Sequence, residues 1–254
     1  GIGCAAEGYN HTTRSHWKVV PDASTGSEVV SPPLSGQAGL DEVKQVIEVL
    51  RSIGCRVNGS TGLHVHHDAR DLTARQIKSV LYLGTKMQAV TDALLPTRVG
   101  GWACRANDLE QMASNLATSR RRLYSSDEGR VAGSITGGGR YYAINPVSYL
   151  QHGTIEFRQH SGSLNATKVL SWIVFTQNIV NTAIVKASTS KPIASANAPI
   201  EHLLWSLGSD AHCELTRAAR RNIVRRIYVN NPRIDLGSAK RYLTREQRAE
   251  VRRS

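Results

Sequence analysis

Apolar and polar positions recur with two different periods along this chain, and the first of them predicts helices. From Asp41 to Gly54 the apolar side chains follow helical spacing, so we expect an amphipathic helix that ends at the glycine. A second helical stripe follows Thr73, where Gln76 completes a capping box, and it continues toward Pro96. These two segments are the clearest helices of the first half of the chain.

The second period, an alternation of two, predicts short strands. We expect strands at residues 28–30, 63–66, 140–145 and 154–160, with prolines closing the first and third. Successive side chains of a strand point to opposite faces, so each segment sorts its residues into two sets. Mixed with the helices, these strands indicate an α+β fold.

The remainder of the chain is predicted to be helical. A helix is expected to begin at Asn107 or Asp108, and a long apolar helix runs from an Asn165 cap to Ile184. Small residues and prolines at 188–199 indicate a linker. We therefore expect one domain over residues 1–187, followed by the linker and a helical, basic C-terminal region over residues 188–254.

Charge changes this picture at the C-terminal end. The 254 residues contain 32 Lys and Arg against 20 Asp and Glu, a net charge of +12, and arginines crowd residues 214–254. The favoured interpretation of such an arginine-rich end is a solvated helical face. Binding of nucleic acid is the more specific but less favoured interpretation. Arg221 and Arg225 share one helix face at i, i+4, which could border a phosphate site.

Cysteine spacing and hydropathy bear on the cellular compartment of the protein. The four cysteines form no CxxC pair, so neither a zinc knuckle nor a dithiol redox site is indicated. No apolar run approaches the ~20 residues that span a bilayer, and no signal peptide opens the chain. We expect a soluble, cytoplasmic protein without a membrane partner.

Ionisable residues share faces of two predicted strands. Leu63 and Val65 would be buried, which turns His64 and His66 the other way, while Glu156 and Arg158 share one face of the later strand with His160; the face opposite them carries Ile155 and Phe157. These residues could serve the structure alone, His64 and His66 as hydrogen-bonded histidines of a sheet and Glu156 with Arg158 as an ion pair on a strand face. Taken together, however, imidazole and carboxylate ligands beside an arginine suit a divalent ion that bridges phosphate oxygens.

Three blocks of sequence make the chain recognisable. Residues 28–34 (EVVSPPL), 62–66 (GLHVH) and 153–164 (GTIEFRQHSGSL) resemble, in order and rough spacing, the signature blocks of the amidoligase family. The resemblance covers about residues 7–187. That family is similar to glutamine synthetase and glutamate-cysteine ligase, which implies a glutamine-synthetase-like curved antiparallel sheet with helices packed on one face.

The resemblance also implies a reaction and a site. ATP would phosphorylate a carboxylate, and an amine would then attack the acyl phosphate, so the expected cofactors are ATP and magnesium and the substrates are a carboxylate and an amine, possibly on a peptide or protein. Glu28, His64 and Glu156 would be metal ligands, and Arg158, His64 and His66 would be catalytic. The residues expected to contact ATP are Arg98, Asn145, Arg158 and His160.

One departure from the family leaves alternatives open. Its members typically open with a strand that bears a Glu-x-Glu metal pair, whereas only Glu7 and Asp22 precede Glu28 here. Either the chain lacks its start, or it is a degenerate member, a scaffold that binds nucleic acid or protein through its basic end. A zinc hydrolase using His64, His66 and Glu156 is a further alternative. Related ligases often assemble, so a homo-oligomer is admissible.

Overall fold

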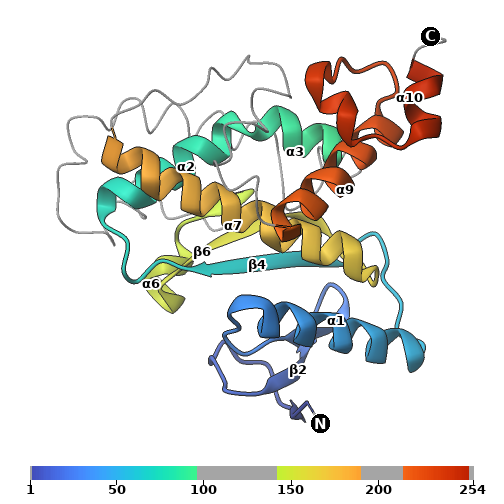
Figure 1. The fold of residues 1–254 in the computed structure, drawn as a ribbon. Coiled ribbons are helices and arrows are strands. Elements are labelled where there is room, and N and C mark those ends of the chain that lie inside the picture. The colour runs from blue at the N-terminus through green and yellow to red at the C-terminus, as the bar shows by residue number, and fades with distance from the viewer. Residues whose placement is uncertain (1, 96–141, 190–213, 252–254) are drawn as a thin grey trace. The chain divides into compact units, whose positions relative to one another are not determined.

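The computed structural model describes residues 2–95, 142–189 and 214–251, so Arg98 and the helix expected from Asn107 or Asp108 lie outside the described residues. The chain divides into two compact units. The first comprises Gly1–Leu63 and Ser161–Leu170, and the second comprises His64–His160 and Ser171–Ser254. Each unit combines helices with a three-stranded sheet, which confirms a mixed α and β architecture (Figure 1).

The first sheet contains β1 (Cys4–Ala6), β2 (Trp17–Asp22) and β3 (Gly26–Val30), in that order. β1 and β2 were not among the expected strands; β2 and β3 are antiparallel, whereas β1 pairs with β2 in parallel, with Cys4 opposite Trp17. A tight turn joins antiparallel strands, whereas parallel strands need a longer connection that brings the chain back to the end where the first strand began. Residues 7–16 provide that connection between β1 and β2. This sheet is therefore mixed rather than antiparallel throughout.

Helix α1 (Gly36–Ser52) completes the first unit. It begins before Asp41, the expected start, because its first turn is polar and small and so has no apolar periodicity to predict it. Its end is as predicted, since Gly54 adopts φ +82° just beyond the helix and donates its N–H to the Arg51 carbonyl at 3.1 Å. Buried Trp17 of β2 donates its indole N–H to Glu42 Oε1 at 2.6 Å, which ties the helix to the sheet.

The second sheet has the order β4 (Gly62–Asp68), β6 (Thr154–Ser161), β5 (Ile144–Asn145). Backbone bonds from Gly162 to Thr61 and from Ala69 to Gly153 mark the two ends of the β4–β6 pairing, so these strands run antiparallel. β5 and β6 are antiparallel too. β5 is shorter than the strand expected at 140–145, and α6 (Ser148–His152) connects it to β6.

Helices α2 (Ala74–Lys86), α3 (Gln88–Leu94) and α7 (Ala166–Thr189) follow the predicted apolar stripes. The capping box of Thr73 and Gln76 is present, and the Asn165 side chain accepts the Lys168 N–H at 3.0 Å. The stripe toward Pro96 is interrupted at Met87, which separates α2 from α3.

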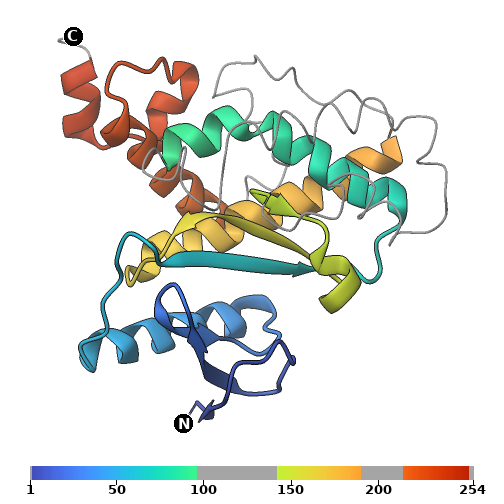
Figure 2. The same ribbon diagram turned by 180° about the vertical axis from the view of Figure 1, so that it is seen from behind.

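Helix α7 packs along the second sheet (Figure 2). His67 Nε2 of β4 lies 2.8 Å from the Thr176 hydroxyl of this helix, and the Ser79 hydroxyl of α2 donates to its Ala183 carbonyl. Ile155 and Phe157 of β6 are fully buried, as the alternation predicts. One face of the sheet therefore belongs to the core, and the opposite face carries His64, His66 and Glu156.

Residues 214–251 contain three helices, α9 (Glu214–Asn230), the 3-10 helix η2 (Gly237–Tyr242) and α10 (Arg245–Val251). The Asn230 side chain of α9 donates to the Leu94 carbonyl at the end of α3, and Arg225 Nε donates to the Tyr242 carbonyl. Helices of the length and apolarity that a bilayer requires are absent from the segments that the structure describes.

Candidate functional site

A buried carboxylate on the middle strand organises the candidate site. Glu156 of β6 is only 4% exposed, yet it points away from the apolar face that Ile155 and Phe157 form. Because β6 lies between β4 and β5, both neighbouring strands place side chains beside it. The site is thus assembled from three strands of one sheet.

Hydrogen bonds from β5 and β6 hold this carboxylate. Asn145 lies opposite Glu156 in the strand register, and its Nδ2 donates to Glu156 Oε2 at 2.8 Å. Arg158, two positions along β6, donates from Nη1 to Glu156 Oε1 at 2.6 Å. Asn145 accepts the Val147 N–H at 2.9 Å, so the amide that orients Glu156 is itself fixed.

The histidines of β4 approach the same carboxylate oxygen. His64 Nδ1 lies 3.2 Å from Glu156 Oε1, and His66 Nε2 lies 3.6 Å from it. The other ring nitrogen of His66 lies 2.9 Å from the hydroxyl of Thr154. The structure therefore brings together four residues predicted from the sequence, His64, His66, Glu156 and Arg158, with Asn145 behind them.

Electrostatics keep the carboxylate charged. Burial acts to raise the pKa of Glu156, but His66, Arg158 and His64 outweigh it, so the pKa lies below its ordinary value. Burial lowers the pKa of His66, although Glu156 opposes this. At neutral pH the cluster thus contains one carboxylate, one guanidinium and a neutral His66, able to bind an anion or accept a proton.

The cluster is held together by ion pairs and hydrogen bonds. Within the described ranges, no three His, Cys, Asp or Glu side chains are placed to hold a metal ion. Arg158 Nη1 bonds to the oxygen of Glu156 that the histidines also approach. A cation at Glu156 would require Arg158 to leave that oxygen.

His160, which alternation places on the polar face of β6 with Glu156 and Arg158, is only 1% exposed and packs against α7, the helix on the core face. Its ring lies 5.4 Å from that of Trp172 on α7, and its Nε2 lies 3.3 Å from Arg226 Nη1 on α9. Neither the contact nor Arg226 was expected from the sequence, since nothing in the pattern distinguishes this arginine from its neighbours in α9.

His67 is a second residue that the sequence did not single out. It is buried beneath the sheet, where its ring lies 5.5 Å from that of Phe157 and its Nε2 contacts Thr176. Burial lowers the pKa of His67 to about 4, so the ring is neutral at physiological pH. It lies one residue beyond the strand expected at 63–66, within β4.

Glu28 and the Glu156 cluster belong to different units of the chain. Glu28 is exposed on β3, in the first unit, whereas Glu156 belongs to the second. Its assignment as a metal ligand therefore stays a prediction from the resemblance. Arg98, expected to contact ATP, lies outside the described residues.

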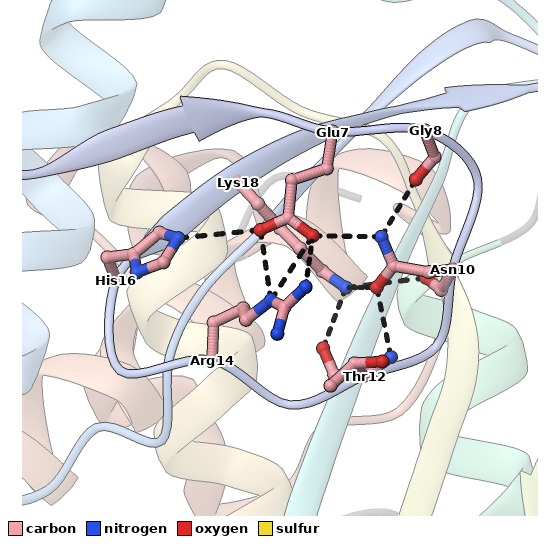
Figure 3. A network of polar contacts seen from close by, with 7 residues as sticks. All are labelled: Glu7, Gly8, Asn10, Thr12, Arg14, His16 and Lys18. Carbon is pink, nitrogen blue, oxygen red and sulfur yellow. Dashed lines mark hydrogen bonds and ion pairs between the residues drawn. The ribbon is translucent and has the colours of Figure 1, made fainter.

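The two acidic residues before Glu28 have local structural partners. Glu7, directly after β1, is bound by Arg14 at 2.9 Å and by Asn10 at 2.9 Å, with His16 at 3.5 Å (Figure 3). The Arg14 guanidinium holds the pKa of Glu7 at about 2. Asp22 accepts the N–H groups of Ser24 and Thr25 in the turn before β3.

Buried Lys18 also binds the segment of residues 7–16 that contains Glu7. Its ammonium donates to the side chain of Asn10 at 2.7 Å and to the Thr12 carbonyl at 2.8 Å (Figure 3). The side chains around Glu7 thus hold residues 7–16 against β2.

Comparison with known proteins identifies one family. A family model described as "Putative amidoligase enzyme" matches residues 5–180, which include both sheets except Cys4, the first residue of β1. Neither the curated proteins nor the solved structures gave a match. The matched residues contain His64, His66, Asn145, Glu156 and Arg158, whereas α9 with Arg226 lies beyond them.

Proposed function

The chain belongs to the amidoligase family, and from that premise we propose that it is an ATP- and magnesium-dependent ligase that joins a carboxylate to an amine through an acyl phosphate. The observation that carries the proposal is the Glu156 cluster. Arg158 and two histidines converge there on one buried carboxylate, on the face of the sheet opposite the core. The glutamine-synthetase-like curvature of the sheet stays a prediction.

In the first proposed step, a carboxylate oxygen of the donor substrate attacks the γ-phosphorus of ATP. The bond from that phosphorus to the bridging oxygen breaks, and ADP leaves with the electron pair. Arg158 would bind the oxygens of the phosphoryl group in transfer, because a guanidinium presents several N–H donors and a permanent positive charge. Asn145 would keep Glu156 in place while Arg158 exchanges its partner.

In the second step, the amine nitrogen attacks the acyl carbon, and the carbon–oxygen bond to phosphate breaks. The nitrogen must lose a proton as the amide forms. His66 is suited to accept it, since burial lowers its pKa and its Nε2 faces the cluster. Thr154, which contacts the other ring nitrogen, would hold the ring in this orientation.

Magnesium fits the donor set only in part. Glu156 supplies the oxygen chemistry that magnesium prefers, and His64 and Glu28 complete the ligand set that the family resemblance implies. Because Arg158 binds Glu156 Oε1 at 2.6 Å, the carboxylate can take a cation only when Arg158 moves. When bound, magnesium would neutralise phosphate charge.

Calorimetric titration of ATP, with and without magnesium, tests the proposal. We expect magnesium-dependent binding by the natural chain and at least about 10-fold weaker binding by Arg158→Gln, from the loss of a charged hydrogen bond. Arg70→Gln is the control, because Arg70 is exposed and pairs with Asp68. Absence of ATP binding by the natural chain would refute the ligase and favour a scaffold of the same family.

A further inference from the structure

Three arginines of the C-terminal helices meet at one tyrosine. Tyr242 is the last residue of η2, and Arg241 of the same helix donates from Nη2 to its hydroxyl at 3.3 Å. The central carbon of that guanidinium lies 5.1 Å from the centroid of the tyrosine ring. From α9, Arg220 bonds to the same hydroxyl, and Arg225 donates from Nε to the Tyr242 carbonyl at 3.0 Å. Contacts with Tyr242 therefore hold guanidinium groups from two helices at one place.

The sequence predicts a solvated helical face here, and two of these arginines depart from it. Arg220 is only 6% exposed and Arg225 is half-buried, whereas Arg241 is exposed. Removing a guanidinium from water is costly, and bringing like charges together adds repulsion. A bound anion would offset both costs, because it supplies negative charge and acceptor oxygens at the same place.

The Tyr242 hydroxyl shows that the arginines favour an oxyanion here. Burial acts to raise the pKa of Tyr242, but Arg241 and Arg220 outweigh it, so the pKa lies below its ordinary value. Positive charge that stabilises a phenolate would equally stabilise a phosphate oxygen beside it. Arginine and tyrosine side chains are also common donors to the phosphates of nucleic acids.

Positive charge extends beyond these three arginines. Residues 214–251 contain ten Lys and Arg against four Asp and Glu. Two of the carboxylates have other partners, since Asp235 lies 3.5 Å from Lys240 and Glu250 accepts the Tyr228 hydroxyl at 3.1 Å. Further arginines of α9 and α10 are exposed: Arg217, Arg245 and Arg248.

The extent of this charge favours a polyanion over a small ligand. A single phosphate would use only the arginines at Tyr242, whereas a nucleic acid would also use the charge around them. Surfaces that bind nucleic acid are much more positively charged than those that bind protein. An acidic protein is therefore the less favoured partner.

We propose that α9, η2 and α10 form a nucleic-acid-binding surface on which Arg225 and Arg241, beside Tyr242, bind phosphates of the backbone. Arg220 would hold the tyrosine hydroxyl in place. Contacts to phosphate carry no sequence information, so binding would not depend on base sequence. The surface lies beyond the residues 5–180 that match the family, and it does not require the proposed ligase activity.

Fluorescence anisotropy of a labelled DNA duplex of mixed sequence, titrated with the full chain at several salt concentrations, tests this surface. We expect Arg241→Gln to weaken binding by about 10-fold, as the loss of a charged hydrogen bond predicts. It should also reduce the slope of log affinity against log salt by about 1, because one phosphate contact is lost. Arg75→Gln removes the same charge from an exposed position on α2 and should change neither quantity.

Arg225→Gln should weaken binding by a similar factor. If this variant fails to fold in circular dichroism, Arg241→Gln decides, because Arg241 is exposed. Equal affinity of the natural chain and Arg241→Gln would overturn the role of the arginines at Tyr242.

Two further probes distinguish the kinds of anion. Calorimetric binding of inorganic pyrophosphate without binding of the duplex would assign the arginines to a small phosphate ligand and overturn the nucleic-acid surface. Tighter binding of labelled polyglutamate than of the duplex would indicate an acidic protein and would overturn it too. Absence of duplex binding even at low salt would contradict the proposal directly.

Discussion

Glu156 and Arg158 lie two positions apart on β6 and are joined by an ion pair of 2.6 Å between Oε1 and Nη1. Their side chains are 6% and 16% exposed, so the pair is largely removed from water. A buried pair is poor evidence for stability by itself, but breaking it leaves one charge without its partner. The pair therefore couples the stability of the sheet to the proposed chemistry of the site.

Replacing Glu156 with Gln tests that coupling. The variant leaves Arg158 without its carboxylate, so we expect the free energy of unfolding to fall by about 2 kcal/mol, less than for a fully buried pair because Arg158 retains some solvent contact. Magnesium-dependent ATP binding should also be lost. Urea denaturation and calorimetry measure the two effects.

The control for this variant is Glu48→Gln. Glu48 is an exposed residue of α1 and meets Lys44 at 4.0 Å, so its loss should change the unfolding free energy by less than about 0.5 kcal/mol. If Glu156→Gln were as stable as the natural chain and bound ATP equally well, Glu156 would have no role in the site.

The burial of His67 predicts a dependence of stability on pH. Its folded pKa of about 4 lies below the ordinary 6.5, so the unfolded chain binds a proton that the folded chain resists. This contribution is fully present above pH 6.5 and is lost as the pH falls toward 4, with a total of roughly 3 kcal/mol. The unfolding free energy from urea titrations should fall across this window.

His67→Gln isolates the effect, because Gln can still bond to Thr176 but does not titrate. The variant should lose less stability between pH 6.5 and 4 than the natural chain does. His66, whose pKa is also lowered, is present in both proteins and cancels in the comparison. Identical pH profiles would mean that His67 is not the titrating group.

Gly84 allows α2 to approach β5 closely. A Cβ at this position would collide with Ile144 Cδ1, so Gly84→Ala should destabilise the fold by about 1–2 kcal/mol, although alanine favours a helix. Ile144→Val removes the colliding methyl group. We expect the double variant to lose less unfolding free energy than the two single variants lose in total, because the collision is relieved. Urea unfolding of the four proteins in a double-mutant cycle measures this. Additive losses would contradict the close approach.

Trp17 connects β2 to α1 in the first unit. It is 7% exposed and donates to Glu42 at 2.6 Å, which indicates a structural role. Trp17→Phe keeps most of the apolar contact but loses the charged hydrogen bond, so a loss of about 2 kcal/mol is expected in thermal or urea unfolding. ATP affinity should stay unchanged, and a weakened affinity would contradict a purely structural role.

Alternation along single strands predicted which side chains share a face. The sequence placed His64 with His66 and Glu156 with Arg158, and the structure confirms both pairs, because a period of two follows from strand geometry alone. It did not predict that β4 and β5 flank β6. Strand order depends on long-range packing, which local periodicity does not encode.

The features that sequence reasoning missed have a common cause. The parallel pairing of β1 depends on the path of residues 7–16, and the start of α1 depends on residues without an apolar pattern. Arg226 is one of many arginines near the C-terminal end, and only the packing of α9 beside His160 distinguishes it. Each depends on tertiary contacts rather than on local spacing.

The register of β5 against β6 also sets an order for assembly during folding. Asn145 and Glu156 are separated by 11 positions, so their contact closes a short loop and costs little chain entropy. His66 and Thr154 are 88 positions apart, and that contact must wait for a long loop to close. In a refolding chain, Asn145 and Arg158 would therefore engage the carboxylate before the histidines arrive, and the last interactions to form would be those on which the proposed proton transfer depends.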